Sequence, residues 1–471
     1  MDQLLWQDAT AQAEAIRAGE VSAVELLDAY LDRIEVLDPI LRAYVTVDAD
    51  GSRAAAVAVD AQRGLDPSAL PPFAGVALSI KDSDDVAGLP TTHSCEVLAD
   101  HVAATDAPAV HRLRASGAVI VGKSNVPEFN SDLTNSRLNG ICRNPWDTGR
   151  SAGGSSGGAA AALAGGLCAV SHGTDGAGSI RVPSSWCGVV GVKPTRGLVA
   201  FGPEDGNPYY GTSVPGVLVR SVRDAAAMLD VLAPVSDPWT PSRARSFATE
   251  AQLEPGRLRV AVCTTFPLGD IDPEVASAVD DAGRLVESLG HAVERAGPDW
   301  PVVLAASGGP LSVPGAAGLV SLEDAHRLEP RNQATLVSLA ALTVLEHSRW
   351  VDAARAASRD FLEFWDDVDV LVTPTVGVVA PTVDWAPWDD SPAAHGARFA
   401  TFPNFAHPFN VTGQPALSLP LAWSSTGLPI GVQLVGPRLG DATLLRLATQ
   451  LEQAAPWIER IAAAARALPT R

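Results

Sequence analysis

The segment 149–191 constrains the fold more than any other part of the chain. It holds twelve glycines, and a short apolar run, 167–170, lies among them. A flexible linker has a similar content of glycine and serine, but it would not contain the alanine-rich run 159–163 or side chains such as Trp186. Glycines at this density let the backbone turn sharply and approach other groups closely. We therefore expect a buried strand, a closely packed helix of small residues and several tight turns here.

Composition places this segment in a globular protein. The chain has 471 residues, of which 46% are hydrophobic and 19% are charged, and this balance excludes an intrinsically disordered chain. Lys and Arg number 34 and Asp and Glu number 54, which gives a formal net charge of -20. Such a charge repels phosphate backbones, so nucleic acid is not expected as a direct partner.

Targeting and cysteine patterns favour a cytoplasmic protein that does not bind a membrane. The first residues lack the basic start and apolar run of a signal peptide, and the weakly apolar stretch 157–170 is too short to cross a bilayer. The five cysteines are widely spread and form no CxxC pair (Cys95, Cys142, Cys168, Cys187 and Cys263). We therefore expect neither a disulfide framework nor a zinc site, and a reducing compartment fits best.

Short apolar strands alternate with helical segments along most of the chain, which predicts an α/β fold built on a parallel or mixed sheet. Ser22 and Glu25 form a capping box at the start of one helix, and Pro39 should end that run. Residues 234–255 have the composition of a surface excursion, and 375–390 that of a structured loop. The expected helices are 8–18, 22–37, 108–116, 273–289, 333–365 and 442–453, and the expected strands are 74–80, 118–121, 167–170, 258–264, 291–294, 368–372, 416–421 and 430–435.

Lysine is scarce, and this points to particular positions. Only Lys81, Lys123 and Lys193 occur, so Arg carries nearly all positive charge. Arg stays protonated in proteins, whereas a buried Lys can lose its proton and act as a base. Either the lysines are retained for such a role or their scarcity reflects chance.

A serine needs a base to become a nucleophile, and three arrangements compete. The run GGSSGG (153–158) matches the GxSxG nucleophile elbow, but the preceding residues 144–151 predict a loop where that fold requires a strand. The second arrangement takes a histidine such as His172 or His407 as the base, but a lone histidine is more often structural. The sequence has no HExxH pattern or other histidine pair at ligand spacing, which leaves metal catalysis unsupported. In the third arrangement, Lys81 ends a buried strand and would activate Ser155 or Ser179, both of which lie in glycine-rich turns.

These motifs resemble the amidase signature family. The runs GGSSGG (153–158) and GTDGAGSIRVP (173–183) are similar to its hallmark, and further similar blocks cover 75–82, 88–92, 119–129, 187–195, 409–416 and 427–433. The resemblance spans most of the chain and is weakest over 235–365. It implies one domain over 1–471 with a central mixed, twisted sheet covered by helices on both faces. The signature core would lie at about 70–230 and a divergent, substrate-shaping region at about 235–400.

The resemblance also implies a Ser–cisSer–Lys triad and amide hydrolysis without a cofactor. Ser179 would form the acyl-enzyme, Ser155 would bridge after a cis peptide bond to Gly154, and neutral Lys81 would be the base. The remaining implied roles are an oxyanion hole of backbone N–H groups at Gly176, Ala177, Gly178 and Ser179, and support from Ser156, Asp175 and Arg181. Lys123 and Lys193 would then be structural.

Two departures from the family pattern bear on function. Ala177 stands where the family more often has Gly, which narrows the pocket without removing a backbone donor. Val182 stands where the glutaminase subunit of a tRNA-dependent amidotransferase would have Gln, and the acidic charge also disfavours a role beside tRNA. That subunit and a non-catalytic binding relative remain the alternatives to a stand-alone amidase.

The substrate is open at this stage. We expect a small-molecule amide as the partner, with a homodimer left open. Asn130 and Ser131 are candidates for the substrate pocket, and the aromatic residues Trp385, Phe399, Phe402 and Phe405 would line either an apolar pocket or the core.

Overall fold

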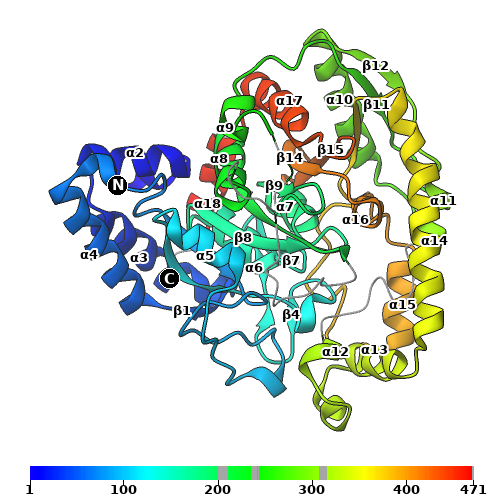
Figure 1. Cartoon of the computed structure of the whole chain (residues 1–471), viewed down its shortest axis with the longest axis horizontal. Helices are drawn as coiled ribbons and strands as arrows, with labels where there is room; N and C mark the ends of the chain where they lie inside the picture. The colour runs from blue at the N-terminus through cyan, green and yellow to red at the C-terminus, as the bar shows by residue number, and fades with distance from the viewer. Residues whose placement is uncertain (200–210, 235–240, 242, 307–315, 469–471) are drawn as a thin grey trace.

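An eleven-stranded sheet runs through the molecule (Figure 1). The computed structural model describes residues 1–199, 211–234, 241, 243–306 and 316–468. From one edge to the other, the strands are β1 (Tyr44–Val47), β3 (Val119–Ser124), β2 (Ala77–Lys81), β8 (Val170–Asp175), β10 (Val214–Val219), β9 (Val190–Lys193), β14 (Ala416–Trp423), β15 (Pro429–Val435), β13 (Val370–Pro374), β11 (Arg259–Val262) and β12 (Ala292–Arg295).

The sheet is mixed, which confirms the expected class. β2 runs parallel to both β3 and β8, and β11 runs parallel to β12 and β13. The other neighbouring pairs are antiparallel, including β14 and β15, which the sequence predicted as adjacent strands joined by a turn. Two small hairpins lie apart from this sheet and pair β4 (Asn135–Ser136) with β5 (Gly140–Ile141), and β6 (Arg143–Asn144) with β7 (Asp147–Ser151).

Helices cover both faces of the sheet. Every residue of β2, β3, β8, β10 and β15 is buried, although successive side chains of a strand point to opposite faces. In Figure 1, α2 to α4 lie on one side of the molecule and the long helix α14 runs along the opposite side. The helices are α1 (Asp2–Leu5), α2 (Ala9–Ala18), α3 (Ala23–Leu41), α4 (Ala49–Leu65), α5 (Pro108–Ala115), α6 (Gly157–Ala164), α7 (Arg181–Cys187), α8 (Val222–Leu232), α9 (Phe247–Glu250), α10 (Pro273–Ser288), α11 (Trp300–Ala305), α12 (Ala316–Leu319), α13 (Pro330–Ala340), α14 (Val344–Leu362), α15 (Pro392–Ala400), α16 (Pro408–Thr412), α17 (Asp441–Ala454) and α18 (Ile458–Arg466).

Helix α6 confirms the close packing expected of the glycine-rich segment. All of its residues are buried, and it packs against β2, β3, β8 and β10. A Cβ atom on Gly158 would lie 2.3 Å from the backbone nitrogen of Asn125, so only glycine allows this approach. The helix therefore brings the turn before it against the middle of the sheet.

Two predicted helix boundaries are wrong. Helix α3 continues past Pro39 to Leu41, because Leu41 is buried and the Asp38 carboxylate accepts hydrogen bonds from the two backbone N–H groups that follow Arg42. The helix expected over 333–365 is two helices, α13 and α14. The sequence contains the reason, because Thr343 and Glu346 form a capping box that starts α14.

Of the two segments expected to be irregular, 375–390 is a loop, whereas part of 234–255 is helical. Residues 375–390 form a loop that holds one bridge, between Arg150 and Thr382, as expected of a structured loop. Within 234–255, positions 235–240 and 242 lie outside the described residues, and α9 occupies 247–250 with Phe247 buried in the main core. The end of that segment is therefore packed, which corrects the expectation of a surface excursion. In the described part of the chain, no helix has the length and apolar character needed to cross a membrane.

Candidate active site

Lys81 lies at the carboxyl end of β2, beside the carboxyl end of β8. The two strands are parallel and place Ser79 opposite Ser171, so both strands end at the same edge of the sheet. Clefts in open α/β sheets form where strands end in this way. Lys81 therefore faces the residues at the end of β8 and the glycine-rich turns that follow it.

The Lys81 amine makes three close polar contacts. Its Nζ atom lies 2.8 Å from Ser155 Oγ, 3.0 Å from Thr174 Oγ1 and 3.3 Å from the Thr174 carbonyl oxygen. The side chain is fully buried, and burial lowers the pKa of Lys81 to about 7, although Asp84 and Asp175 act in the opposite direction. A neutral amine has two N–H donors and one lone pair. The contacts fit that form if Thr174 accepts twice and Ser155 donates its hydroxyl proton.

The other two lysines are also buried but do not contact either serine. Lys123 donates to the Pro90 carbonyl and to Thr91 Oγ1, and it forms an ion pair with Asp82 at 3.2 Å. Lys193 donates to the Pro194 carbonyl, and burial lowers its pKa to about 7 as well. A lowered pKa is thus shared by two lysines, and contact with a serine distinguishes Lys81.

Ser155 lies in a turn between β7 and α6, with a cis peptide bond to Gly154. The residues before this turn include the strand β7, so the loop expected over 144–151 is wrong for 147–151. That strand pairs with β6, contacts the 375–390 loop through the bridge from Arg150 to Thr382, and lies outside the main sheet. Among the described residues, no histidine is hydrogen-bonded to Ser155 or Ser179, which leaves the nucleophile-elbow interpretation without its base.

Ser179 lies in the turn between β8 and α7, which contacts the turn that holds Ser155. Its carbonyl accepts a hydrogen bond from the Ser156 N–H at 3.0 Å, and Ser156 Oγ lies 3.4 Å from the Thr174 carbonyl oxygen. Ser155 and Ser179 both line one cavity of about 510 Å³. Within the described residues, no hydrogen bond joins the two serine hydroxyls, so the structure connects Lys81 to Ser155 and brings Ser179 to the same cavity.

The turn 176–179, which is the expected oxyanion loop, has three backbone N–H groups free of other described partners. Within the described residues, the N–H groups of Gly176, Ala177 and Ser179 have no hydrogen-bond acceptor. The Gly178 N–H, by contrast, donates to Asp175 Oδ1 at 2.8 Å. This contact corrects the expectation that Gly178 supplies an oxyanion donor. Gly178 instead has a φ of +105°, which a residue with a side chain rarely adopts.

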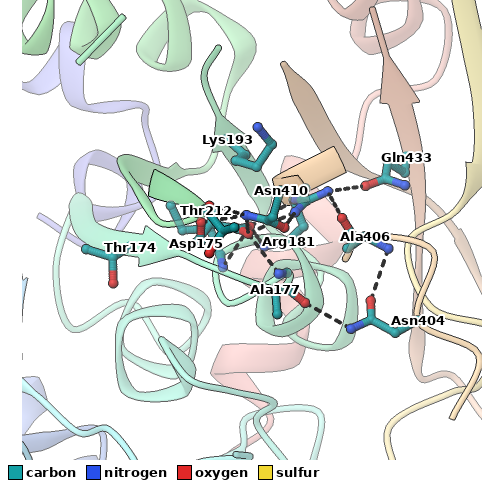
Figure 2. A network of polar contacts seen from close by, with 12 residues as sticks. Thr174, Asp175, Ala177, Arg181, Lys193, Thr212, Asn404, Ala406, Asn410 and Gln433 are labelled. Carbon is teal, nitrogen blue, oxygen red and sulfur yellow. Dashed lines mark hydrogen bonds and ion pairs between the residues drawn. The ribbon is translucent and has the colours of Figure 1, made fainter. Parts of the chain in front are cut away.

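Asp175 and Arg181 form the centre of a buried hydrogen-bond network, here called the hub, beside this loop (Figure 2). Arg181 donates to both carboxylate oxygens of Asp175, at 2.8 and 2.9 Å, and neither side chain is exposed. Burial alone would raise the pKa of Asp175, but the charge and hydrogen bonds of Arg181 outweigh burial and hold that pKa well below its usual value. The carboxylate therefore stays ionised while it holds the Gly178 N–H.

Three amide side chains from the last quarter of the chain complete the hub. Asn410 donates to Asp175 Oδ1 and accepts from Arg181, and Gln433 accepts from Arg181 at 2.7 Å. Asn404 donates to the Ala177 carbonyl at 2.9 Å and accepts from the Ala406 N–H, as Figure 2 shows. Sequence reasoning assigned no role to these residues or to Thr174, although Thr174, Asn410 and Gln433 stand in the motif runs quoted above.

The cavity contains both pocket candidates from the loop around Asn130 and two of the four aromatic candidates. Asn130 and Ser131 both line it, as expected. Of the four aromatic candidates, Phe399 and Phe402 line the cavity, whereas Trp385 and Phe405 pack in hydrophobic clusters beside it. The full lining set is Asn130, Ser131, Ser155, Thr174, Gly176, Ala177, Ser179, Thr212, Ser213, Phe266, Leu268, Leu304, Arg331, Asn332, Thr335, His395, Gly396, Phe399, Phe402, Asn404 and His407.

Two histidines near the site, His407 and His172, are uncharged at neutral pH. His407 lines the cavity, and burial lowers its pKa to about 4. Burial also lowers the pKa of His172, whose two ring nitrogens have no hydrogen-bond partner within the part of the chain that is described. No group of three or more His, Cys, Asp or Glu side chains suited to holding a metal ion occurs in that part either.

Known proteins resemble this chain over almost its whole length. A family model described as Amidase matches residues 25–445. AmiB2 of Mycobacterium tuberculosis, whose name calls it an amidase, is 41% identical over 467 residues, with 97% of this chain and 98% of that protein covered. The acylamidase of Rhodococcus erythropolis is 34% identical over 469 residues, covering 97% of each chain. A solved structure of 6-aminohexanoate cyclic dimer hydrolase with its substrate has a TM-score of 0.88 and 35% identity, with 97% of this chain and 98% of that chain covered.

Proposed function

The chain belongs to the amidase family, and we propose that it hydrolyses a carboxylic amide to an acid and ammonia or an amine through an acyl-enzyme on Ser179. One observation carries the proposal: the buried Lys81 amine, with its pKa lowered to about 7, lies 2.8 Å from Ser155 Oγ at the edge of a cavity that Ser179 also lines. A neutral amine in that place is a base with direct access to a serine proton.

The proton path follows from these contacts. Neutral Lys81 accepts the Ser155 hydroxyl proton, and Ser155 Oγ in turn accepts the proton of Ser179 as Ser179 Oγ attacks the amide carbonyl carbon. Hydrogen bonds of this kind are often long without substrate and shorten in the reacting complex. The same protons return through Ser155 to the leaving nitrogen, and a water molecule then releases the acid from Ser179 by the reverse path.

The charge that develops on the carbonyl oxygen requires fixed donors. We assign this role to the backbone N–H groups of Gly176, Ala177 and Ser179, because they are free while the Gly178 N–H is bound by Asp175. Asp175, Arg181 and Ser156 support the loop without contacting substrate. The Ala177 methyl group lies at the cavity wall and narrows it, as the sequence suggested.

The residues that line the cavity come from both the expected catalytic core and the expected substrate-shaping region. The triad comes from within 70–230, whereas Phe266, Leu304, Arg331 and Phe399 reach the cavity from within 235–400. We therefore propose that the first region supplies the chemistry and the second selects the amide. All five cysteines are buried and unpaired, which supports the proposed cytoplasmic location.

Single substitutions test the triad. We expect Ser179→Ala and Lys81→Ala each to abolish amide turnover, and Ser155→Ala to lose most of the rate, because each removes a link of the proton path. Turnover of a panel of aliphatic, aryl and peptide amides is measured for each variant, with circular dichroism as the check on folding. Lys193→Met is the matched control, because Lys193 is equally buried and has a similarly lowered pKa but contacts neither serine; its turnover should stay within a few-fold of the original protein.

Labelling separates this function from its alternatives. A fluorophosphonate should modify Ser179, as shown by peptide mass spectrometry, and full turnover by a Ser179→Ala protein would refute the proposal. Gel filtration with an assay of the eluted fractions tests the stand-alone role. Activity in the protein alone, as a monomer or a homodimer, excludes dependence on an amidotransferase partner.

A further inference from the structure

A glycine occupies the middle of a helix that forms one wall of the cavity. Helix α15 contributes His395, Gly396 and Phe399 to the lining. Residues three and four apart share a helix face, so Gly396 lies on the face that carries Phe399. The helix packs against α13, which contributes Arg331, Asn332 and Thr335 to the same cavity.

The backbone does not require glycine at this position. Gly396 has no positive φ, and a Cβ atom built on it would meet no atom within 4 Å. Glycine inside a helix is less stable than alanine, because it loses more conformational freedom on folding. The residues beside it in the chain, His395 and Ala397, are ordinary helix residues. Gly396 is exposed and lines the cavity, and neither backbone conformation nor crowding accounts for a glycine there.

The cavity has polar walls, which include the α13 residues Asn332 and Thr335, and an apolar wall of phenylalanine and leucine side chains. Phe266, Leu268, Leu304 and Phe402 line the cavity with Phe399. Arg331 is the one Lys, Arg, Asp or Glu among the described lining residues, and it is 7% exposed and paired with Asp132 and Glu329. A charged substrate group would find no free counter-ion here, and an apolar group would find contact surface.

We propose that Gly396 determines substrate size by keeping open a subsite for a bulky, uncharged aryl or branched alkyl group of the amide. This inference rests on the proposed amide hydrolysis at Ser179. A side chain at position 396 would fill the subsite and exclude the larger substrates, while the reacting groups at Lys81, Ser155 and Ser179 stay in place. Gly396 is thus a specificity position and takes no part in the chemistry.

The test measures kcat/KM for a small amide, acetamide, and two bulky ones, benzamide and acetanilide, which place the ring on either side of the scissile bond. In Gly396→Leu the ratio of bulky to small kcat/KM should fall about tenfold or more for the bulky amide that the original protein prefers. Gly396→Ala should shift the ratio in the same direction by a smaller factor, and it serves as the second variant if Leu lowers the thermal midpoint. Gly64→Leu is the matched control, because Gly64 also lies in an exposed helix, α4, with no atom within 4 Å of a built Cβ; its ratio should not change.

The outcomes separate the inference from the function on which it rests. An unchanged ratio in folded Gly396→Leu and Gly396→Ala proteins overturns the size role and leaves amide hydrolysis intact. A Ser179→Ala protein that hydrolyses these amides at the original rate overturns the proposed function itself. A fall in the ratio for the Gly396 variants but not for Gly64→Leu supports the subsite.

Discussion

At the residue scale, the molecule depends on where it places its few lysines. All three are at most 1% exposed, so the surface relies on Arg for its positive charge. Burial lowers the pKa of both Lys81 and Lys193 to about 7, but only Lys81 has a serine hydroxyl within reach. Burial therefore has the same effect on the pKa of both amines, and the neighbouring groups make Lys81 alone the candidate for the proposed base.

The pH dependence of the rate should follow Lys81. Its folded-state pKa is lowered from 10.5 to about 7, so the base is protonated and inactive below pH 7 and free above it. We expect kcat/KM for an amide without ionisable groups to rise about tenfold per pH unit below pH 7 and to level off above it. Steady-state kinetics from pH 5.5 to 9 measure this profile.

Glu329, which pairs with the cavity residue Arg331, also titrates in this range and needs a control. Burial raises the pKa of Glu329, which pairs with Arg331, to about 7. The increase of kcat/KM with pH should persist in Glu329→Gln, because Glu329 does not contact the serines. A profile that is flat or falls between pH 5.5 and 8 would contradict the role of Lys81 as the base.

At the element scale, the Asp175–Arg181 hub connects parts of the chain that lie far apart in sequence. It joins β8 and α7 to the segment before α16, to α16 itself and to β15. The oxyanion loop lies between the two ionic partners, since Asp175 precedes it and Arg181 follows it. The geometry of that loop is therefore set by elements more than 200 residues away.

Removal of the arginine should destabilise the fold strongly. Arg181→Met leaves the Asp175 carboxylate buried without its ionic partner, and breaking such a buried pair costs about 3–5 kcal/mol of unfolding free energy. Urea denaturation followed by circular dichroism measures the loss. Arg53→Met removes an ion pair to Asp28 in which both side chains are nearly half exposed, and it should leave the urea midpoint nearly unchanged. Equal midpoints for the two variants would show that the hub contributes little to stability.

Sequence patterns predicted part of the sheet, but they missed β1, β9 and β10 and placed β8 too early, at 167–170. Lys81, Ser155 and Ser179 became the proposed triad because their motifs are local, and the close packing of α6 follows from its run of small residues. The hub residues Asn404, Asn410 and Gln433 were not assigned, because their contacts cross more than 200 residues and depend on strand order. Pro39 was misjudged as a helix end because tertiary burial of Leu41 outweighed the local preference.

At the scale of the whole molecule, the burial of every lysine should protect the folded protein from amine-reactive reagents. Brief exposure to an N-hydroxysuccinimide ester should modify only the α-amino group of the folded protein. After denaturation in guanidinium, Lys81, Lys123 and Lys193 should react as well, so intact mass spectrometry should show up to three further adducts. Rapid modification of any of the three lysines in the folded protein would show that its site opens to solvent.

The reach of the hub across the chain also has a consequence during synthesis on the ribosome. A nascent chain that has passed residue 191 already carries Lys81, Ser155 and Ser179, but Asn404, Asn410 and Gln433 have not yet been translated. Without Asn410, Gln433 and the likewise untranslated Ala406, the Arg181 side chain keeps Asp175 alone among its described acceptors, and without Asn404 the Ala177 carbonyl lacks its donor. Catalysis should therefore begin only when nearly the whole message has been read, and a prematurely terminated product would carry the reacting residues without cleaving any amide.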